Sequence, residues 1–458
     1  MQECEELPEP CVDKNAGMPQ DILKNNDIPG LSKLEAAIGM SRKWDAREAG
    51  REVAETAIRQ LHEPPSFFLL FSTIHYEKYG GFQEFLNGVW DVLPKGTPLV
   101  GGTVAGFMNN YGCYTRGASA LAVSYRDMDV ALGFGKNTKR NPKKAANQSS
   151  EIIKKEFSNS KYKNKFLLNL VSGPETPSIP GVGRKKIIRS GIMSKVATQA
   201  IGISQILFQK GLGREDEIFE NIAQKLPDYY MILGTTIDDY RGINNFQFLN
   251  DKILTNTIVN LGILTDLNIN VNTTHGMKKT DIKFEITKLS KNKHIIQEIN
   301  CKPAVPELLR LLKWPEDFLT DKTMLKTILY YPISLKRNGR EVPVVMPFIL
   351  KNSIMIPCVI DRGDVSTLTV SGKNLVNAVE NNLKCFSNIQ PEFGIISSCV
   401  TILETLGDKV FALRENMLNY FKEKPFLMFW CAGEGSYSQI KNLTYANMSF
   451  NTVVFGRQ

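Results

Sequence analysis

The stretch from residue 67 to residue 106 decides the fold; it begins FFLLFS (67–72) and ends PLVGGTVAG (98–106). The first run is short and wholly apolar, as expected of a strand that is buried on both faces. Between the two runs, apolar residues recur at helical spacing: Phe82, Phe85, Leu86, Val89 and Leu93. A strand, a helix and a second strand with short connections predict a parallel crossover unit of an α/β fold.

The pattern continues on both sides of this unit. Ser41 is a good N-cap for a preceding helix over 46–61, which Pro64 and Pro65 end. Residues 117–135 predict two further strands joined by a polar turn. Residues 1–38 contain turn-forming residues and little periodicity, so we expect a tail there.

The carboxyl-terminal part of the chain repeats the order helix, strand, helix, strand and glycine-rich turn. Ser371 is expected to cap a helix, and strands are expected at 393–397 and 426–430 with a helix at 403–421 between them. We therefore predict a mixed α/β fold of two pseudo-equivalent halves. Helices would cover sheets that pack through a shared core, in a layered αββα-like arrangement.

Glycine-rich turns follow three of the predicted strands, at 101–106, 234–239 and 431–436. In open α/β sheets ligands bind at this end of the strands, where backbone N–H groups point outward and glycine permits close approach. The alternative is that the glycines only make tight turns and the acidic side chains cap helices or face water. The ligand-site hypothesis assigns the recognition of charge to Asp238, Asp239 and Glu434.

Composition narrows the classes of function. The 458 residues are 42% hydrophobic and 22% charged, and no run approaches the roughly 20 apolar residues of a membrane span, so we expect a cytoplasmic protein with no membrane partner. The net charge of +9 is concentrated in 136–165, where aromatic residues are sparse, so we expect a solvated surface and no nucleic-acid partner. The eight cysteines and four histidines are scattered, which predicts no metal site.

Several of these turns resemble motifs of the FIST family, named for F-box and intracellular signal-transduction proteins. VGGTVAG (100–106) is similar to the glycine signature of the amino-terminal FIST half, and LGTTIDD (233–239) is similar to its second turn. The family usually has a glycine at the position of Thr235. In the other half, Ser398-Cys399 and Gly433-Glu434, followed by YANMS (445–449), match the closing motifs.

The resemblance spans about residues 31–455 and implies the domain organisation. An amino-terminal FIST domain is expected at 39–300, with a basic insertion at 174–195, and a carboxyl-terminal domain at 301–458. The family often has an arginine where this chain has Ile402, so the ligand is expected to differ. The expected ligand-binding residues are Gly101, Gly102, Thr103, Gly106, Gly234, Thr235, Thr236, Asp238, Asp239, Cys399, Gly433, Glu434 and Asn447.

The resemblance implies a sensory module that binds a small polar ligand, an amino acid or a related metabolite, and signals through a separate protein. Three alternatives stay open: a protein-interaction scaffold without a ligand, a haem-based gas sensor, and an enzyme. His75 and His275 are the haem-ligand candidates, although no cofactor is expected. Cys399 and Cys431 are the candidate nucleophiles, weighed against buried structural thiols.

Overall fold

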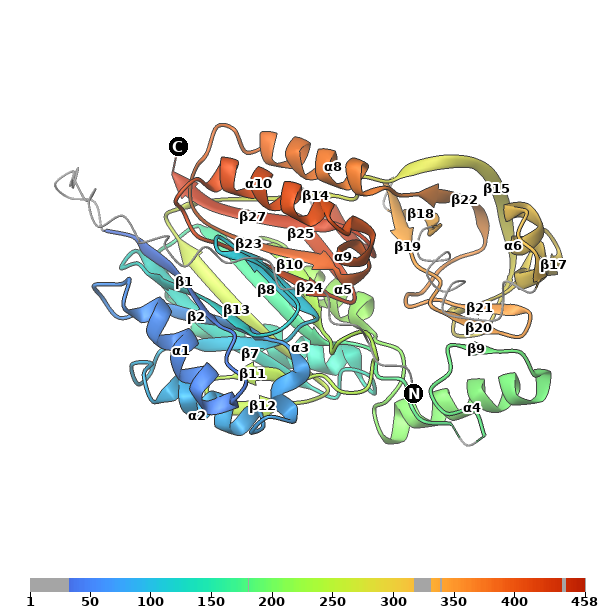
Figure 1. Ribbon diagram of the computed structural model, residues 1–458, viewed down its shortest axis with the longest axis horizontal. Helices are drawn as coiled ribbons and strands as arrows, with labels where there is room; N and C mark the ends of the chain where they lie inside the picture. Colours follow the sequence, from blue (N-terminus) through green and yellow to red (C-terminus); the bar gives the residue numbers. More distant parts are fainter. Residues whose placement is uncertain (1–32, 180, 317–330, 338–339, 439–441, 458) are drawn as a thin grey trace. The chain divides into compact units, whose positions relative to one another are not determined.

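The computed structural model describes residues 33–179, 181–316, 331–337, 340–438 and 442–457 (Figure 1). Contacts join Leu34–Gln458 into one compact unit. Of the predicted tail at 1–38, residues 1–32 lie outside the described residues. The rest differs from the prediction, because strand β1 (Glu35–Ser41) pairs along its whole length with β6.

Three successive segments of the chain repeat one order of elements. The first contains β1, α1 (Ala46–Ile58), β2 (Phe67–Ser72), α2 (Phe82–Trp90), β3 (Leu99–Thr103), β4 (Gly106–Asn109), β5 (Gly112–Tyr114) and β6 (Ala118–Ser124). The second contains β7 (Met128–Lys136), α3 (Pro142–Glu156), β8 (Asn164–Ser172), α5 (Glu215–Lys225), β10 (Tyr230–Thr236), β11 (Gln247–Leu249), β12 (Lys252–Leu254) and β13 (Thr257–Thr265).

The third segment contains β14 (Asn268–Thr274), α8 (Gly372–Lys384), β23 (Gln390–Cys399), α9 (Val400–Leu406), α10 (Lys409–Phe421), β24 (Phe426–Cys431), β25 (Glu434–Ser438), β26 (Asn442–Ala446) and β27 (Phe450–Arg457). The mixed α/β class is therefore confirmed. The repeat occurs three times, because the strand-and-turn junction near 229–239 belongs to a segment of its own.

Each segment builds most of one six-stranded sheet and lends a hairpin to another. Within the described residues the orders are β1-β6-β2-β3-β11-β12, β7-β13-β8-β10-β25-β26 and β14-β27-β23-β24-β4-β5. The central pairs β2–β3, β8–β10 and β23–β24 are parallel, as predicted for crossover units. The hairpin β4–β5 thus leaves the first segment for the third sheet, β11–β12 enters the first sheet, and β25–β26 enters the second.

The three sheets enclose one apolar core. Alternate residues of each central strand point into it, including Phe71, Leu168 and Phe429, and the rings of Phe71 and Phe429 stack at 4.3 Å. The residues between them point outward and pack under helices, as Leu70 does beneath α1 and α2. This alternation explains why the runs at 67–72 and 426–431 are apolar throughout.

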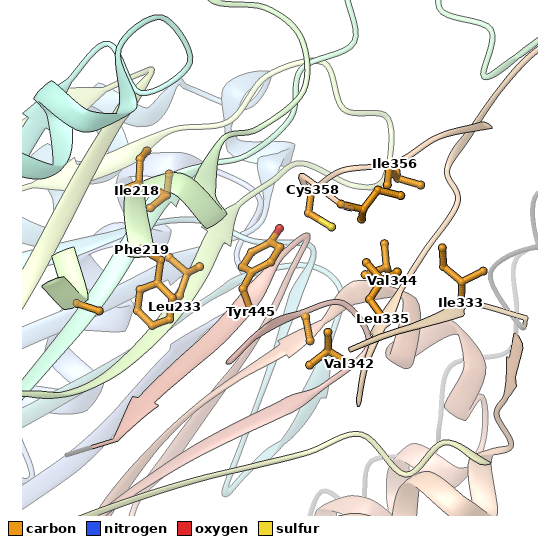
Figure 2. Close-up of a cluster of buried hydrophobic side chains, with 14 of the residues drawn as sticks. Ile218, Phe219, Leu233, Ile333, Leu335, Val342, Val344, Ile356, Cys358 and Tyr445 are labelled. Atoms are coloured by element: carbon orange, nitrogen blue, oxygen red, sulfur yellow. The ribbon is translucent and has the colours of Figure 1, made fainter. Parts of the chain in front are cut away.

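A fourth sheet is inserted between β14 and α8. It contains β15 (Lys278–Leu289), β16 (Ile295–Ile299), β17 (Lys302–Pro303), β18 (Ile333–Arg337), β19 (Arg340–Val344), β20 (Phe348–Leu350), β21 (Ser353–Met355) and β22 (Gly363–Thr369), with helix α6 (Ala304–Leu312). The expected domain boundary at 300/301 falls inside this insertion. Figure 2 shows Tyr445 between Phe219 of α5 and Cys358 and Val344 of the inserted region, so one apolar cluster continues from beneath α5 into the inserted region.

Some predicted boundaries differ for local reasons. The helix predicted to begin after Ser41 begins at Ala46, because Asp45 is the N-cap and its carboxylate accepts a 2.9 Å hydrogen bond from the Glu48 amide. Ser371 does cap α8 as predicted. The expected helix at 403–421 is divided into α9 and α10 at Gly407. The expected basic insertion at 174–195 contains the short strand β9 (Ile187–Ile188), which pairs with β20, and the start of α4 (Gly191–Leu207).

Candidate functional site

The three glycine-rich turns lie together and are joined by backbone hydrogen bonds. Ala105 donates to the Trp430 carbonyl, Ile237 donates to the Thr103 carbonyl, and Thr235 donates to the Gly433 carbonyl, each at 3.0 Å. The three bonds connect every turn to both others. The exchange of hairpins causes this meeting, because each turn is the point where the chain leaves one sheet for the next.

The glycines of these turns are packed against neighbouring atoms. A Cβ atom on Gly102 would lie 2.6 Å from the Phe246 carbonyl oxygen, and one on Gly101 would lie 1.7 Å from that of Leu70. A Cβ on Gly234 would lie 2.3 Å from the ring of Phe429, and one on Gly433 would lie 2.7 Å from the Tyr445 hydroxyl. These glycines therefore let the strand tips approach one another, and that contact leaves no space for a guest at their Cα atoms.

Thr235 joins two of the turns through its side chain. Its Oγ1 accepts hydrogen bonds from the amides of Ala432 (3.0 Å) and Gly433 (2.8 Å). A glycine at this position could not make these bonds. Two further threonines among the predicted residues also make hydrogen bonds through their side chains: Thr103 accepts from the Phe246 amide at 3.0 Å, and Thr236 donates to Asn245 at 2.8 Å.

Glu434 is completely buried at the centre of this region. Its Oε1 accepts hydrogen bonds from the Ser449 amide (2.7 Å) and hydroxyl (3.2 Å), while Oε2 has no hydrogen-bond partner among the described residues. Burial raises the pKa of this carboxyl well above its usual range. Asn447 is also buried and accepts a hydrogen bond from the Val345 amide at 3.4 Å.

The two cysteines considered as nucleophiles are buried. Burial raises the pKa of Cys399 to about 12 and that of Cys431 well above its usual value, with the neighbouring Glu434 charge adding to both effects. Both thiols are therefore protonated at neutral pH, and a protonated thiol is a weak nucleophile.

The two aspartates of the second turn have different environments. Asp238 is buried, and its carboxylate accepts hydrogen bonds from the amides of Gly242 (2.8 Å) and Ile243 (2.7 Å), so it fixes the loop that follows β10. Asp239 is exposed and forms a 2.6 Å ion pair with Arg241. Among the predicted ligand-binding residues, Asp239 is the exposed one; the others are buried.

An open cavity of about 400 Å³ lies beside the joined turns and contains Asp239. Val104 and Ala105 of the first turn form part of its wall. The remaining lining residues come from loops and from the 3-10 helix η1 (Ile74–Glu77): Trp44, Thr73, Ile74, His75, Glu77, Lys78, Tyr79, Thr115, Arg116 and Arg241. Its volume lies within the range of small-molecule sites.

Aromatic and cationic side chains dominate this cavity. The Arg116 guanidinium lies 4.0 Å from the ring centroid of Trp44 and donates a hydrogen bond to the Arg42 carbonyl. No carboxylate among the described residues lies within ion-pair distance of Arg116. The rings of Tyr79 and His75 pack edge-on against Trp44, at 5.0 and 5.8 Å.

His75 is neutral in this setting. Burial, and secondarily the charge of Arg116, lowers its pKa to about 4. Its Nδ1 lies 2.7 Å from the Thr73 hydroxyl, and Nε2 is buried without a hydrogen-bond partner among the described residues. His275, the other candidate haem ligand, accepts a hydrogen bond from the Met277 amide through Nδ1 at 3.1 Å.

Four cavity residues were not predicted from the sequence: Trp44, Tyr79, Arg116 and Arg241. These residues lie in loops, where no periodicity marks them. The proximity of Arg241 to Asp239 in the sequence was the signal that could have identified one of them. The solvated basic stretch predicted at 136–165 also needs a correction, because Lys139 within it is buried and paired with Glu175 at 3.1 Å.

The family model of the FIST N domain matches residues 66–302, which run from the start of β2 into the inserted sheet. This chain belongs to the FIST family. FIST domains are a family of sensory signal-transduction domains. The match includes the first two glycine-rich turns and most of the cavity wall, from Thr73 to Arg241.

Other comparisons add no information about function. No curated protein matches this FIST chain. Among solved structures, "Structure of PurLQS from Thermotoga maritima" aligns at 11% identity over 93% of this chain and 73% of that chain, with a TM-score of 0.19. A TM-score this low is not evidence of a shared fold or function. In the part of the FIST protein that the structure describes, no helix is long and apolar enough to cross a membrane.

Proposed function

We propose that this protein is a sensor that binds a small polar metabolite of the amino-acid class in the cavity lined by His75, Arg116 and Arg241, and signals to a separate protein. The observation that carries the proposal is the open cavity of about 400 Å³ beside the joined strand turns. The buried turns support this cavity, and the loops around them present the binding groups.

The charges and rings of the cavity suit a zwitterion with an apolar or aromatic part. Arg116 offers a guanidinium that has no ion-pair partner among the described residues, which suits a carboxylate. Glu77 and Asp239 supply acidic groups for an ammonium. Trp44 and Tyr79 offer ring faces and edges for the remainder of the ligand.

The cavity also has a route by which binding can alter the rest of the molecule. Its wall combines the first segment with the loop after β10, and Asn244 of that loop donates a 2.9 Å hydrogen bond to Glu77. The same loop contacts the third segment, because the Tyr240 hydroxyl donates a 2.6 Å hydrogen bond to the Val400 carbonyl at the start of α9. A ligand that moves this loop would therefore shift contacts in all three segments.

A thermal-shift screen of amino acids and related carboxylates tests the proposal. A ligand at 100 times its Kd should stabilise the folded state by about 2.7 kcal/mol and raise Tm by a few degrees. Arg116→Ala should abolish the shift. Arg126→Ala removes an exposed arginine that pairs with Glu63 and does not line the cavity, and it should leave the shift unchanged.

The screen can also contradict the proposal. A complete absence of shifts across the carboxylate set would exclude this ligand class. A ligand that stabilises the Arg116→Ala protein as strongly as the natural one would bind elsewhere, and the cavity would lose its assignment.

A further inference from the structure

Helix α4 carries apolar side chains on the surface that faces solvent. They are 40% to 78% exposed and follow one another at helical spacing: Ile192, Val196, Ile203, Ile206 and Leu207, with Phe208 at the C-cap. The spacing of four, seven, three and one residues places the five helical ones along one side. A helix on a protein surface ordinarily shows polar residues there.

The opposite side of α4 is anchored to the protein. Ala197 is buried in a small apolar cluster with Ile188 and Leu212, and Ser194 and Ser204 are buried beside it. Arg140 holds the carboxyl end, donating hydrogen bonds to the carbonyls of Ile206 and Leu207 at 2.6 and 2.7 Å. The helix is therefore held to the protein by one face, while the opposite face, which carries the exposed apolar residues, points outward.

The charged residues in the segment that contains α4 all have one sign. The segment from Arg184 to Arg214 contains seven lysines and arginines and no aspartate or glutamate. Lys195 lies on the exposed side of α4 itself, while Arg189 and Lys210 flank its two ends. An apolar stripe whose own segment carries only cationic charges is complementary to a surface that is apolar inside and negatively charged outside.

A groove of about 820 Å³ continues this surface at the amino end of α4. Ile192 and Lys195 line it from the helix, and Lys351 and Asn352 line it from the inserted sheet. The groove thus places two ammonium groups and polar side chains directly beside the apolar stripe. Such groups suit phosphate-bearing head groups at the level of the membrane interface.

We infer that α4 docks this protein on an anionic phospholipid bilayer, with the helix lying in the plane of the interface. The stripe would enter the boundary of the acyl chains, and the surrounding lysines and arginines would bind the lipid phosphates. This inference reverses the expectation of no membrane partner, because hydropathy along the sequence does not distinguish an outward apolar face from a buried one. It does not depend on the proposed ligand cavity.

Vesicle co-sedimentation of the full chain tests the inference. Binding is expected to phosphatidylcholine vesicles containing phosphatidylserine, with strong weakening at high salt and little binding to pure phosphatidylcholine. The double variant Ile203→Glu/Ile206→Glu should reduce binding at least tenfold. Phe411→Glu is the matched control, because Phe411 is also an exposed apolar residue on a helix, at 65% exposure on α10, and this change should have no effect.

A second variant covers the case in which the double substitution impairs folding. Ile203→Trp keeps the position apolar, and its fluorescence should shift to shorter wavelength when phosphatidylserine vesicles are added. An unshifted spectrum, or equal binding to neutral vesicles, would overturn the inference. A dimer of the natural protein that becomes monomeric in Ile203→Glu/Ile206→Glu, without vesicle binding, would also overturn it and assign α4 to self-association.

Discussion

Thr235 connects two strand tips through a single hydroxyl group. Its Oγ1 accepts hydrogen bonds from two consecutive amides of the turn after β24, where the family usually has a glycine. The threonine that replaces the family's usual glycine therefore adds a connection between β10 and the turn after β24. The contact lies within the ring of backbone bonds that supports the cavity.

Thr235→Val should lower the free energy of unfolding by about 2 kcal/mol, because it leaves two amides of the turn without their acceptor. Urea denaturation followed by circular dichroism measures the change. Thr235→Ser keeps the hydroxyl and is expected to cost less than half as much. Equal losses in the two variants would contradict this, because they would show that the methyl group, which valine keeps and serine lacks, matters as much as the hydrogen bonds.

His75 should make stability depend on pH. Its folded pKa of about 4 lies below the usual value of 6.5, so the unfolded chain binds the proton more readily between these values. The stabilising contribution is present above pH 6.5 and is lost as the pH falls through this window, by about 2 kcal/mol between pH 7 and pH 5.

His75→Gln should remove that dependence. The difference between the unfolding free energies at pH 7 and pH 5, measured in urea, should shrink by about 2 kcal/mol relative to the natural protein. His62→Gln is the control, since His62 is exposed and its ring contacts Glu35 at the surface. An unchanged pH dependence in His75→Gln would mean that His75 titrates normally in the folded state.

At the scale of elements, the exchanged hairpins hold the three segments together. The turn of β4–β5 is fixed to the start of β24 by Asn110, whose side chain donates to the Lys424 carbonyl (3.0 Å) and accepts from the Phe426 amide (3.1 Å). The hairpin therefore has its strand pairing and its turn contacts in a sheet built mainly by the third segment.

Asn110→Ala should destabilise this attachment by about 1 to 2 kcal/mol, because it removes two hydrogen bonds and leaves a strand amide without its acceptor. Hydrogen exchange should show faster exchange in β4, β5 and the start of β24. Tyr111→Ala changes the neighbouring exposed side chain of the same turn and is expected to leave exchange there unaltered. Faster exchange across the whole molecule would indicate global destabilisation instead.

Most individual helices and strands could be predicted from the sequence. The strands are recognisable because their alternate residues face the shared core and the covering helices. FFLLFS at 67–72 is apolar throughout because Phe71 faces the shared core while Leu70 faces the helices. The exchange of hairpins could not be predicted, since Gly106–Asn109 has the same local pattern whichever sheet it joins. Arg116 could not be predicted as a site residue for a related reason, because its loop reaches the cavity only in the folded protein.

At the scale of the whole molecule, one core couples all three sheets. Phe429 of β24 stacks on Phe71 of β2 and lies against Gly234 of β10, so a single ring contacts each sheet. Separate unfolding of one segment would expose this core and break the pairing of two exchanged hairpins. We therefore expect the segments to unfold together.

Phe429→Ala should lower the free energy of unfolding by about 3 to 5 kcal/mol through the cavity it leaves. Calorimetry should still show one transition, at a lower temperature, with the calorimetric and van't Hoff enthalpies in agreement. Phe411→Ala, on the exposed side of α10, should change little. Two resolved transitions in the Phe429→Ala protein would contradict the coupling of the sheets.

The hairpin exchange has a consequence for biosynthesis. During translation, β4–β5 emerges from the ribosome long before its permanent neighbour, as the bond between Asn110 and Lys424 spans 314 residues. Until β24 is synthesised, the nascent chain presents an unpaired strand edge and an open apolar face. Newly made chains should therefore need chaperone protection, and their maturation should be largely post-translational.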